Sequence, residues 1–105
     1  MKFEWDARKN SLNRKKNGCD FADAPEMFLS DRFEMQDQRR DYGKPRFIVI
    51  GNINSRVMVS VFTMRGTDTI RVISLRKANS REKAKFERAI AHRLGPGGRR
   101  EGGGD

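Results

Sequence analysis

The amino-acid sequence predicts an α+β protein in which N-terminal helices pack on a small antiparallel sheet and a C-terminal helix follows. Three stretches, residues 46–53, 57–65 and 70–78, are rich in β-branched and aromatic residues, which favour strands. Short turns join these stretches, so they should pair as antiparallel hairpins. Residues 7–17 and 79–94 lie instead between residues that start and stop helices. Both faces of the strands are rather apolar, and both should therefore be partly covered.

The N-terminal elements follow from short local patterns. Residues 2–5 alternate polar and apolar side chains, which predicts a strand. Trp5 could stack on a nucleic-acid base, but its position on the apolar side of this strand favours a role in the core. Asp6 is expected to cap a helix over residues 7–17, and Gly18 is expected to end it.

A second helix is predicted within residues 20–28. Pro25 lacks an amide donor, so a start at Asp23, which puts the proline in the first turn, is favoured. Residues 32–37 alternate again and predict a charged edge strand, which a polar loop over residues 38–45 follows. The inward stripe of the second helix would consist of Phe21, Ala24, Met27 and Phe28.

The last helix is expected to begin with a capping box. Asn79 can cap the helix, and Glu82 stands three residues later, where its carboxylate would reach back. The packing stripe of this helix would consist of Phe86, Ala89, Ile90 and Leu94. We assign residues 1–94 to one domain, because a chain of 105 residues has the usual size of a single domain. Residues 95–105 are rich in glycine, which predicts a disordered tail.

The composition points to a polyanionic partner. The net charge is +9 and the sequence pI is about 10.4, which is typical of nucleic-acid-binding domains, although charge also keeps a domain soluble and monomeric. The single cysteine, Cys19, excludes an internal disulfide and should be a buried apolar residue. No apolar run reaches membrane-spanning length and no signal peptide opens the chain, so a cytoplasmic location without membrane contact is expected.

The sequence has no pattern for a metal or a cofactor. His92 is the only histidine and is expected to be exposed, and neither a phosphate-binding glycine loop nor a dinucleotide motif is present. A histidine triad or a zinc site cannot be built, so an enzyme would have to work without metal or cofactor. RNA cleavage permits this, because the 2′-hydroxyl of RNA is the nucleophile and arginine and lysine side chains can stabilise the phosphorane.

The segment over residues 70–82 concentrates candidate residues for this chemistry. Arg71 and Arg76 would bind the scissile phosphate, because a guanidinium fork suits phosphate oxygens. Three residues are open as the group that moves protons: Lys9, Lys77 and Glu82. For Glu82, a capping or ion-pair role is favoured over this one. The candidate RNA-binding residues are Asn13, Lys16, Arg46, Arg65 and Arg81.

The first helix carries a basic stripe. Lys9, Asn13 and Lys16 follow the helical repeat and should project along one line. The stripe is either a solvated basic face or a track for the phosphates of RNA, and charge alone does not separate the two interpretations.

Three blocks of the sequence, taken in order, form a recognisable pattern. The first is FEWD followed by Lys9, Asn13, Lys16, Gly18 and Phe21, and the second is Arg46-Phe47 with Gly51. The third consists of Thr63, Arg65, Arg71, Ser74, Arg76, Lys77, Ala78 and Glu82. In residue type and spacing these blocks resemble the BrnT family of toxins. The chain departs from the family pattern at Asn17, where the family usually has histidine, and at Arg40 and Lys44, where it often has histidine and glutamate.

This resemblance implies a RelE-like microbial-ribonuclease fold and the toxin of a type II toxin–antitoxin system. Such a toxin would be an endoribonuclease that cleaves RNA independently of the ribosome and arrests translation. Its partner would be a BrnA-type antitoxin with a ribbon-helix-helix DNA-binding domain, which blocks the toxin and represses the operon. If the family residues at the three departures move protons, the activity of this chain would be weaker, lost or differently tuned.

Two other hypotheses use the same cations. The chain could be a non-catalytic RNA- or DNA-binding module, in which case loss of Arg71 or Arg76 would lower the affinity and its salt dependence together. Part of the basic surface could instead hold an acidic segment of a protein partner, which would then exclude RNA.

Overall fold

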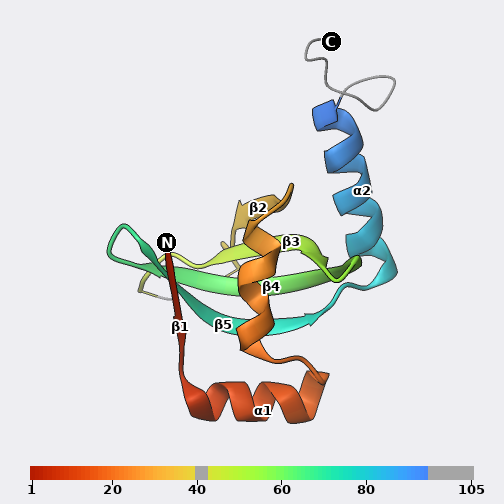
Figure 1. Cartoon of the computed structure of the whole chain (residues 1–105). Coiled ribbons are helices and arrows are strands. Elements are labelled where there is room, and N and C mark those ends of the chain that lie inside the picture. The colour runs from red at the N-terminus through yellow and green to blue at the C-terminus, as the bar shows by residue number, and fades with distance from the viewer. Residues whose placement is uncertain (40–42, 95–105) are drawn as a thin grey trace.

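The computed structural model describes residues 1–39 and 43–94 (Figure 1). Arg40 and the tail predicted at residues 95–105 lie outside the described residues. The elements in chain order are β1 (Lys2–Trp5), α1 (Ala7–Asn17), the 3₁₀ helix η1 (Phe21–Phe28), β2 (Phe33–Gln36), β3 (Phe47–Ile53), β4 (Arg56–Arg65), β5 (Thr69–Lys77) and α2 (Ser80–Leu94). A helix or strand is therefore found at each predicted place. None of the helices within these described ranges is both long and apolar enough to cross a membrane.

The strands form one sheet in the order β1-β5-β4-β3-β2. Strands β2 to β5 are antiparallel to one another, as predicted, and β2 is an edge strand. Asn54 and Ser55 join β3 to β4 with positive φ values of 51° and 65°, as a tight hairpin turn requires. The other edge strand, β1, pairs with β5 in parallel and places Glu4 beside Arg71. The expectation of a wholly antiparallel sheet was wrong at β1, because no hairpin turn links β1 to β5 and sets its direction.

A β-bulge interrupts the pairing of β4 with β5. Val61 lies opposite Ser74, and Phe62 lies opposite Val72, so Ile73 is an extra residue of β5. The bulge allows Val72 and Leu75, three positions apart, to reach the same hydrophobic cluster. It therefore also decides which side chains of β5 share the opposite face.

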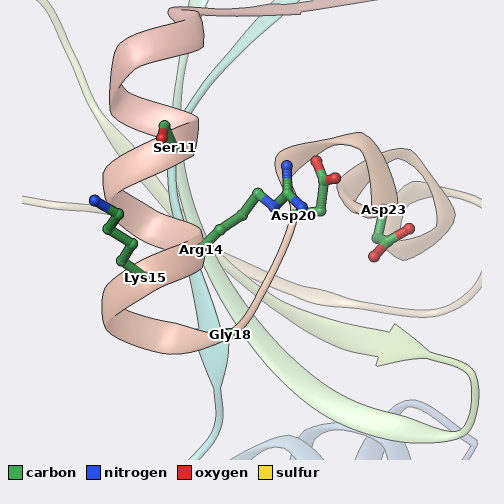
Figure 2. A pocket seen from close by; sticks show the side chains of 6 residues that line it. All are labelled: Ser11, Arg14, Lys15, Gly18, Asp20 and Asp23. Atoms are coloured by element: carbon green, nitrogen blue, oxygen red, sulfur yellow. The ribbon is translucent and has the colours of Figure 1, made fainter.

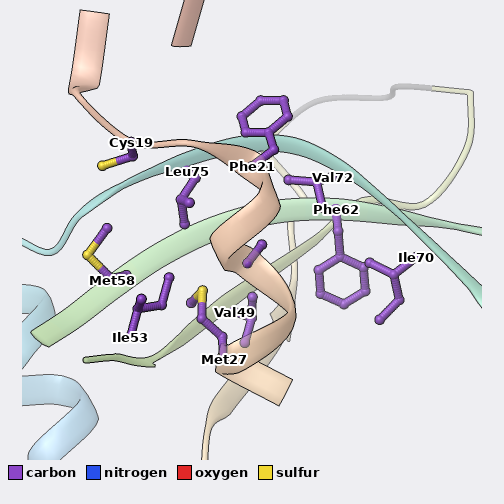
Figure 3. Close-up of a cluster of buried hydrophobic side chains, with 11 residues drawn as sticks. Cys19, Phe21, Met27, Val49, Ile53, Met58, Phe62, Ile70, Val72 and Leu75 are labelled. Atoms are coloured by element: carbon purple, nitrogen blue, oxygen red, sulfur yellow. The ribbon is translucent and has the colours of Figure 1, made fainter. Parts of the chain in front are cut away.

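One face of the sheet is covered by η1. The helix lies across the strands, and its buried side chains pack on theirs (Figures 1 and 3). Cys19 is buried in this cluster and Trp5 packs against it half-buried, which agrees with the predicted roles of both. The buried residues of η1 are Phe21, Ala24 and Met27.

The other face of the sheet is covered in part by α2. Phe86 of α2 is buried with Ile50 of β3 and Val59 of β4, and Ile90 packs against them. The helix packs mainly on β2 and β3 and projects away from the sheet (Figure 1). The α2 side of β4 and β5 therefore lies beside this helix rather than beneath it.

Side-chain caps define the ends of the two α-helices. The carboxylate of Asp6 accepts a hydrogen bond of 3.0 Å from the Lys9 N–H, and Gly18 ends α1 with a φ of 71°. Asn79 and Glu82 form the predicted capping box of α2. The Glu82 N–H donates to the Asn79 side chain at 2.8 Å, and the Asn79 N–H donates to the Glu82 carboxylate at 2.9 Å.

The second helix differs from the prediction. It is a 3₁₀ helix that begins at Phe21, so the expected start at Asp23 was wrong. Its first amides find side-chain acceptors: the Phe21 N–H donates to Asn10 Oδ1 at 2.9 Å, and the next N–H donates to Asp20 Oδ1 at 2.9 Å. These acceptors stabilise the earlier start and leave Pro25 inside the helix.

Candidate active site

The α2 side of β4 and β5 carries two of the predicted catalytic cations, Arg71 and Arg76, and the predicted RNA-binding residue Arg65. Arg76 lies opposite Val59, which packs with α2, and Arg71 lies opposite Thr63 on the same side. Arg65 follows Thr63 by two residues and shares this side as well. We call the α2 side of β4 and β5, which bears Arg65, Arg71, Ser74 and Arg76, the arginine face.

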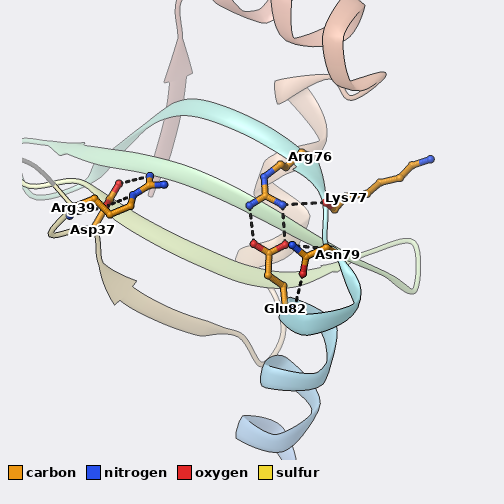
Figure 4. Close-up of polar contacts among 6 residues, drawn as sticks. All are labelled: Asp37, Arg39, Arg76, Lys77, Asn79 and Glu82. Atoms are coloured by element: carbon orange, nitrogen blue, oxygen red, sulfur yellow. Dashed lines mark hydrogen bonds and ion pairs between the residues drawn. The ribbon is translucent and has the colours of Figure 1, made fainter.

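Lys77 lies on the opposite face of the sheet. Its partner in the register is Met58, which belongs to the hydrophobic cluster under η1. The Lys77 side chain points away from Arg76 and Glu82 (Figure 4). Neighbouring residues of a strand alternate between its faces, so this arrangement does not favour the prediction that Lys77 moves a proton at the phosphate bound by Arg76.

Arg71 is held by a carboxylate from β1. Arg71 Nη1 donates to Glu4 Oε2 at 2.9 Å, and the same oxygen is 3.3 Å from Arg65 Nη1. The parallel pairing of β1 with β5 makes this contact between residues that are 67 positions apart. Two guanidinium groups thus share one carboxylate, which leaves a net positive charge. We call Arg65, Arg71 and Glu4 the Arg71 centre.

Arg76 is held by a carboxylate from α2. Its Nη1 and Nη2 donate to the two oxygens of Glu82 at 2.8 and 2.7 Å, and Nη1 also contacts the Lys77 carbonyl at 3.3 Å (Figure 4). The hydrogen bond with Arg76 is the main cause that lowers the pKa of Glu82, and the same bond raises the pKa of Arg76. Glu82 is therefore ionised at neutral pH. We call this ion pair the Arg76 centre.

A further arginine lies within electrostatic range of the Arg76 centre. Arg39 pairs with the buried carboxylate of Asp37 through contacts of 2.8 and 2.7 Å (Figure 4). The positive charge of Arg39 repels that of Arg76 and slightly offsets the rise in the pKa of Arg76. The loop after β2 thus adds a cation to this side of the sheet, which the sequence analysis did not anticipate.

Asn13 is buried rather than exposed to RNA. Asn13 is only 7% exposed. Its side-chain amide binds the edge of β5 at a point beyond the end of β1. Asn13 Nδ2 donates to the Leu75 carbonyl at 2.8 Å and to the Cys19 carbonyl at 2.9 Å, while its Oδ1 accepts from the Leu75 N–H at 3.3 Å. Asn13 was predicted to bind RNA, whereas the structure gives its amide a structural role, binding β5 where a neighbouring strand would pair.

Lys9 and Lys16 lie on the side of α1 that faces away from η1. With about 3.6 residues per turn, these two lysines project to one side of Asn13, and Asn10 and Arg14 project to the other. Asn10 donates to Asp20 at 3.0 Å, so its side of α1 faces η1. The two lysines project to the other side of α1, toward the sheet face that bears the arginines. Both lysines are exposed. The pKa of Asp6 at the start of α1 is lowered mainly by the hydrogen bond from the Lys9 N–H and to a smaller extent by the positive charge of Arg71. Arg71 therefore lies near this end of the helix.

A hollow of about 670 Å³ lies on the other side of α1. Figure 2 shows Arg14 extending toward Asp20 at its wall, and the lining also includes Ser11, Lys15, Gly18 and Asp23. Its charges are of both signs, and it contains none of the predicted catalytic or RNA-binding residues.

The remaining predicted residues lie outside the arginine face. Arg46 is half-buried just before β3, and Arg81 is exposed in the first turn of α2. Of the departures from the family pattern, Asn17 is half-buried and donates to Asn13 and to the Leu75 carbonyl, and Lys44 is exposed. Within the described residues, no three histidine, cysteine or acidic side chains gather where they could hold a metal ion.

The stability of the protein should fall with pH where Glu82 takes up a proton. Because Arg76 holds the pKa of Glu82 below its ordinary value of 4.5, the unfolded chain binds this proton more readily than the folded one. The contribution is complete above about pH 4.5 and is lost as the pH falls through the folded pKa. We expect the urea midpoint to fall more steeply between about pH 5 and pH 3 in the wild type than in Glu82→Gln. Asp6 and Asp20 also have lowered pKa values but titrate in both proteins, so equal slopes would contradict the role of Glu82.

Comparisons with known proteins identify the family of this chain. The model of a family described as "Ribonuclease toxin, BrnT, of type II toxin-antitoxin system" matches residues 5–82. Among solved structures, the crystal structure of the ribonuclease toxin BrnT of Brucella abortus is similar to this chain, with a TM-score of 0.60 and 33% sequence identity. The similarity covers 76% of this chain and 99% of that one. A comparison with curated proteins finds no match.

The family match includes β5, Arg76 and Glu82, but not Glu4. The family match and the structural similarity define the chain as a ribonuclease toxin of a type II toxin–antitoxin system. The particular family is the one that the sequence resembles: the chain belongs to the BrnT toxins. Membership of a type II system implies a protein antitoxin as partner.

Proposed function

We propose that this BrnT toxin is a metal-independent endoribonuclease whose active site is the arginine face. The observation that carries the proposal is the gathering of Arg65, Arg71 and Arg76 on one side of the sheet, and Lys9 and Lys16 are exposed on the side of α1 that faces away from η1. RNA brings its own 2′-hydroxyl nucleophile, so the protein needs to hold the strand and stabilise the charge of the phosphorane. Fixed cationic donors can do both.

The arginine side chains are already arranged for anions. Glu82 occupies the fork of Arg76 with two oxygens, which is how a phosphate would bind the same donors. Arg71 and Arg65 hold Glu4 in a similar way. Lys9 and Lys16 would guide the strand along α1, and Arg46 and Arg81 would contact it at the margins.

Glu82 and Lys9 remain the candidates for proton transfer. The carboxylate of Glu82 lies next to Arg76, but its lowered pKa makes it a weak base while the ion pair is intact. A phosphate that takes over the Arg76 fork would weaken this pair and raise the pKa of Glu82 toward its ordinary value. Binding of RNA would thus prepare Glu82 to accept the proton of the 2′-hydroxyl.

In the cell, cleavage of RNA by this toxin would arrest translation in the cytoplasm. We further propose that a BrnA-type antitoxin with a ribbon-helix-helix DNA-binding domain neutralises it. The RelE-like microbial ribonucleases are the broader group to which we assign the fold, with N-terminal helices on one part of the sheet and α2 on another.

The test is cleavage of a defined single-stranded RNA in the presence of EDTA. We expect cleavage with a 2′,3′-cyclic phosphate product, and a single 2′-deoxy substitution should block cleavage at its own position alone. The matched control is the same sequence as DNA, which should bind and stay intact. Cleavage that requires a divalent metal would contradict the proposal. RNA that binds and stays intact would favour the alternative, a non-catalytic RNA- or DNA-binding module.

A further inference from the structure

We infer that the arginine face binds two different phosphates of one RNA strand, the scissile phosphate at the Arg76 centre and a neighbouring phosphate at the Arg71 centre. This inference rests on the proposed ribonuclease function and changes one part of it. Both arginines were predicted to bind the scissile phosphate, whereas in the structure each is held by a different carboxylate.

The two guanidinium groups are held by carboxylates on different elements. Arg71 is drawn toward Glu4 on β1, and Arg76 is drawn toward Glu82 on α2. The two residues are five positions apart on β5, so their Cα atoms lie on the order of 15 Å apart at about 3.3 Å per residue. A phosphate that takes over the Arg76 fork leaves the Arg71–Glu4 pair intact, and the two side chains could meet at one phosphate only if this second pair broke as well.

The two centres differ in charge, and this difference assigns their roles. The Arg71 centre combines two arginines with one carboxylate, so it keeps a net positive charge that can hold a phosphate. The Arg76 centre is balanced and offers a bidentate fork beside a carboxylate that can exchange a proton. Glu82 is also fixed by the Asn79 N–H at 2.9 Å, which keeps the centre in place during the reaction.

A substrate must therefore extend beyond one phosphate to use the whole face. A dinucleoside monophosphate has a single phosphate and can occupy only the Arg76 centre. A longer single strand can add the contact at the Arg71 centre. A charge-assisted contact of this kind should raise kcat/KM of the longer substrate by about tenfold or more.

The test compares kcat/KM for a dinucleoside monophosphate and for a hexanucleotide with the same cleaved step. We expect the wild type to prefer the hexanucleotide by about tenfold or more. Arg71→Ala should abolish this preference, whereas Arg76→Ala should lower kcat/KM for both substrates by a similar factor and keep the preference. Lys77→Ala is the matched control, since it removes a cation from the same strand on the opposite face, and it should keep the preference as well. A preference that persists in Arg71→Ala would overturn the inference.

A second measurement changes the RNA, in the wild type and in Arg71→Ala. Replacing one phosphate that neighbours the cleaved step by a neutral methylphosphonate should reproduce the loss caused by Arg71→Ala, and the two changes combined should cost no more than either alone. Additive losses would overturn the inference. If the wild type cleaves neither substrate, the proposed function fails by itself. In that case, the affinity for 2′-O-methyl oligonucleotides of both lengths tests whether two phosphates are bound. The wild type should bind the longer oligonucleotide more tightly, and Arg71→Ala should bind both with similar affinity.

Discussion

Replacing Arg76 by alanine should reduce cleavage of single-stranded RNA by about 10²–10³ in kcat, the loss typical for removal of one fixed donor to a transition state. Arg76 presents both terminal nitrogens of its fork to one acceptor, and Glu82 holds the fork in place before RNA arrives. The affinity for RNA should fall less than the rate, because other cations of the face remain. Single-turnover cleavage and salt-dependent binding, measured side by side, check this split.

Two further variants show whether the loss of cleavage rate is due to the bidentate guanidinium group of Arg76. Arg76→Lys keeps the charge but not the bidentate geometry, so its rate should lie between those of the wild type and Arg76→Ala. Lys77→Ala removes the neighbouring charge on the other face and should leave cleavage close to that of the wild type. The Arg76–Glu82 pair is partly exposed, so its loss should lower the stability of the fold only modestly, which a thermal melt can verify. A non-catalytic binding module would instead lose affinity and its salt dependence together in Arg76→Ala, and no variant would cleave RNA.

Replacing Asn13 by alanine should have the largest effect on stability among the polar residues discussed here. The substitution leaves the Leu75 N–H, the Leu75 carbonyl and the Cys19 carbonyl without the amide that binds them in the interior. Buried groups without partners cost about 1–3 kcal/mol each, so we expect the free energy of unfolding to fall by roughly 3 kcal/mol, since Asn17 still contacts the Leu75 carbonyl. Urea unfolding monitored by circular dichroism measures the change.

Asn17→Ala is the matched control for this prediction. Asn17 lies one turn later on α1, is only half-buried, and contacts the Leu75 carbonyl at 3.2 Å, an acceptor that Asn13 binds at 2.8 Å. Its replacement should cost about 1 kcal/mol or less. The salt dependence of RNA binding should be the same in both variants as in the wild type, because neither amide carries a charge. An Asn13→Ala protein that is as stable as the wild type but binds RNA weakly would return Asn13 to the RNA interface.

Local signals in the sequence determined most of the secondary structure. The caps at Asp6, Gly18 and Asn79 are satisfied within a few residues along the chain, so their spacing is visible in the sequence itself. The hairpin pairing of β3 with β4 follows from a two-residue turn and the flanking apolar runs, which are local as well. The BrnT resemblance was also carried by short blocks, and the family match confirmed it.

The composition of the candidate site was predictable only in part. Arg71 and Arg76 were identified because two arginines on a strand that leads into a helix suit phosphate binding. Their partner carboxylates differ in this respect. Glu82 lies six residues from Arg76 and was recognisable from the capping-box spacing, whereas Glu4 lies 67 residues from Arg71 and no local pattern connects them. The one signal for a buried amide was Asn13 itself. The helix α1 has almost no apolar surface, so a polar side chain had to pack against the sheet.

The sequence by itself thus determined the elements, their caps and the basic character of the protein, because those properties depend on neighbours along the chain. Only the tertiary structure decided which groups act together. The parallel pairing of β1 with β5 brings Glu4 to Arg71, and the burial of Asn13 against Leu75 turns a supposed RNA contact into a support for the sheet edge. The alternation of β5 places Lys77 behind the sheet although it follows Arg76 directly. These outcomes depend on contacts between distant segments, and such contacts exist only after the chain has folded.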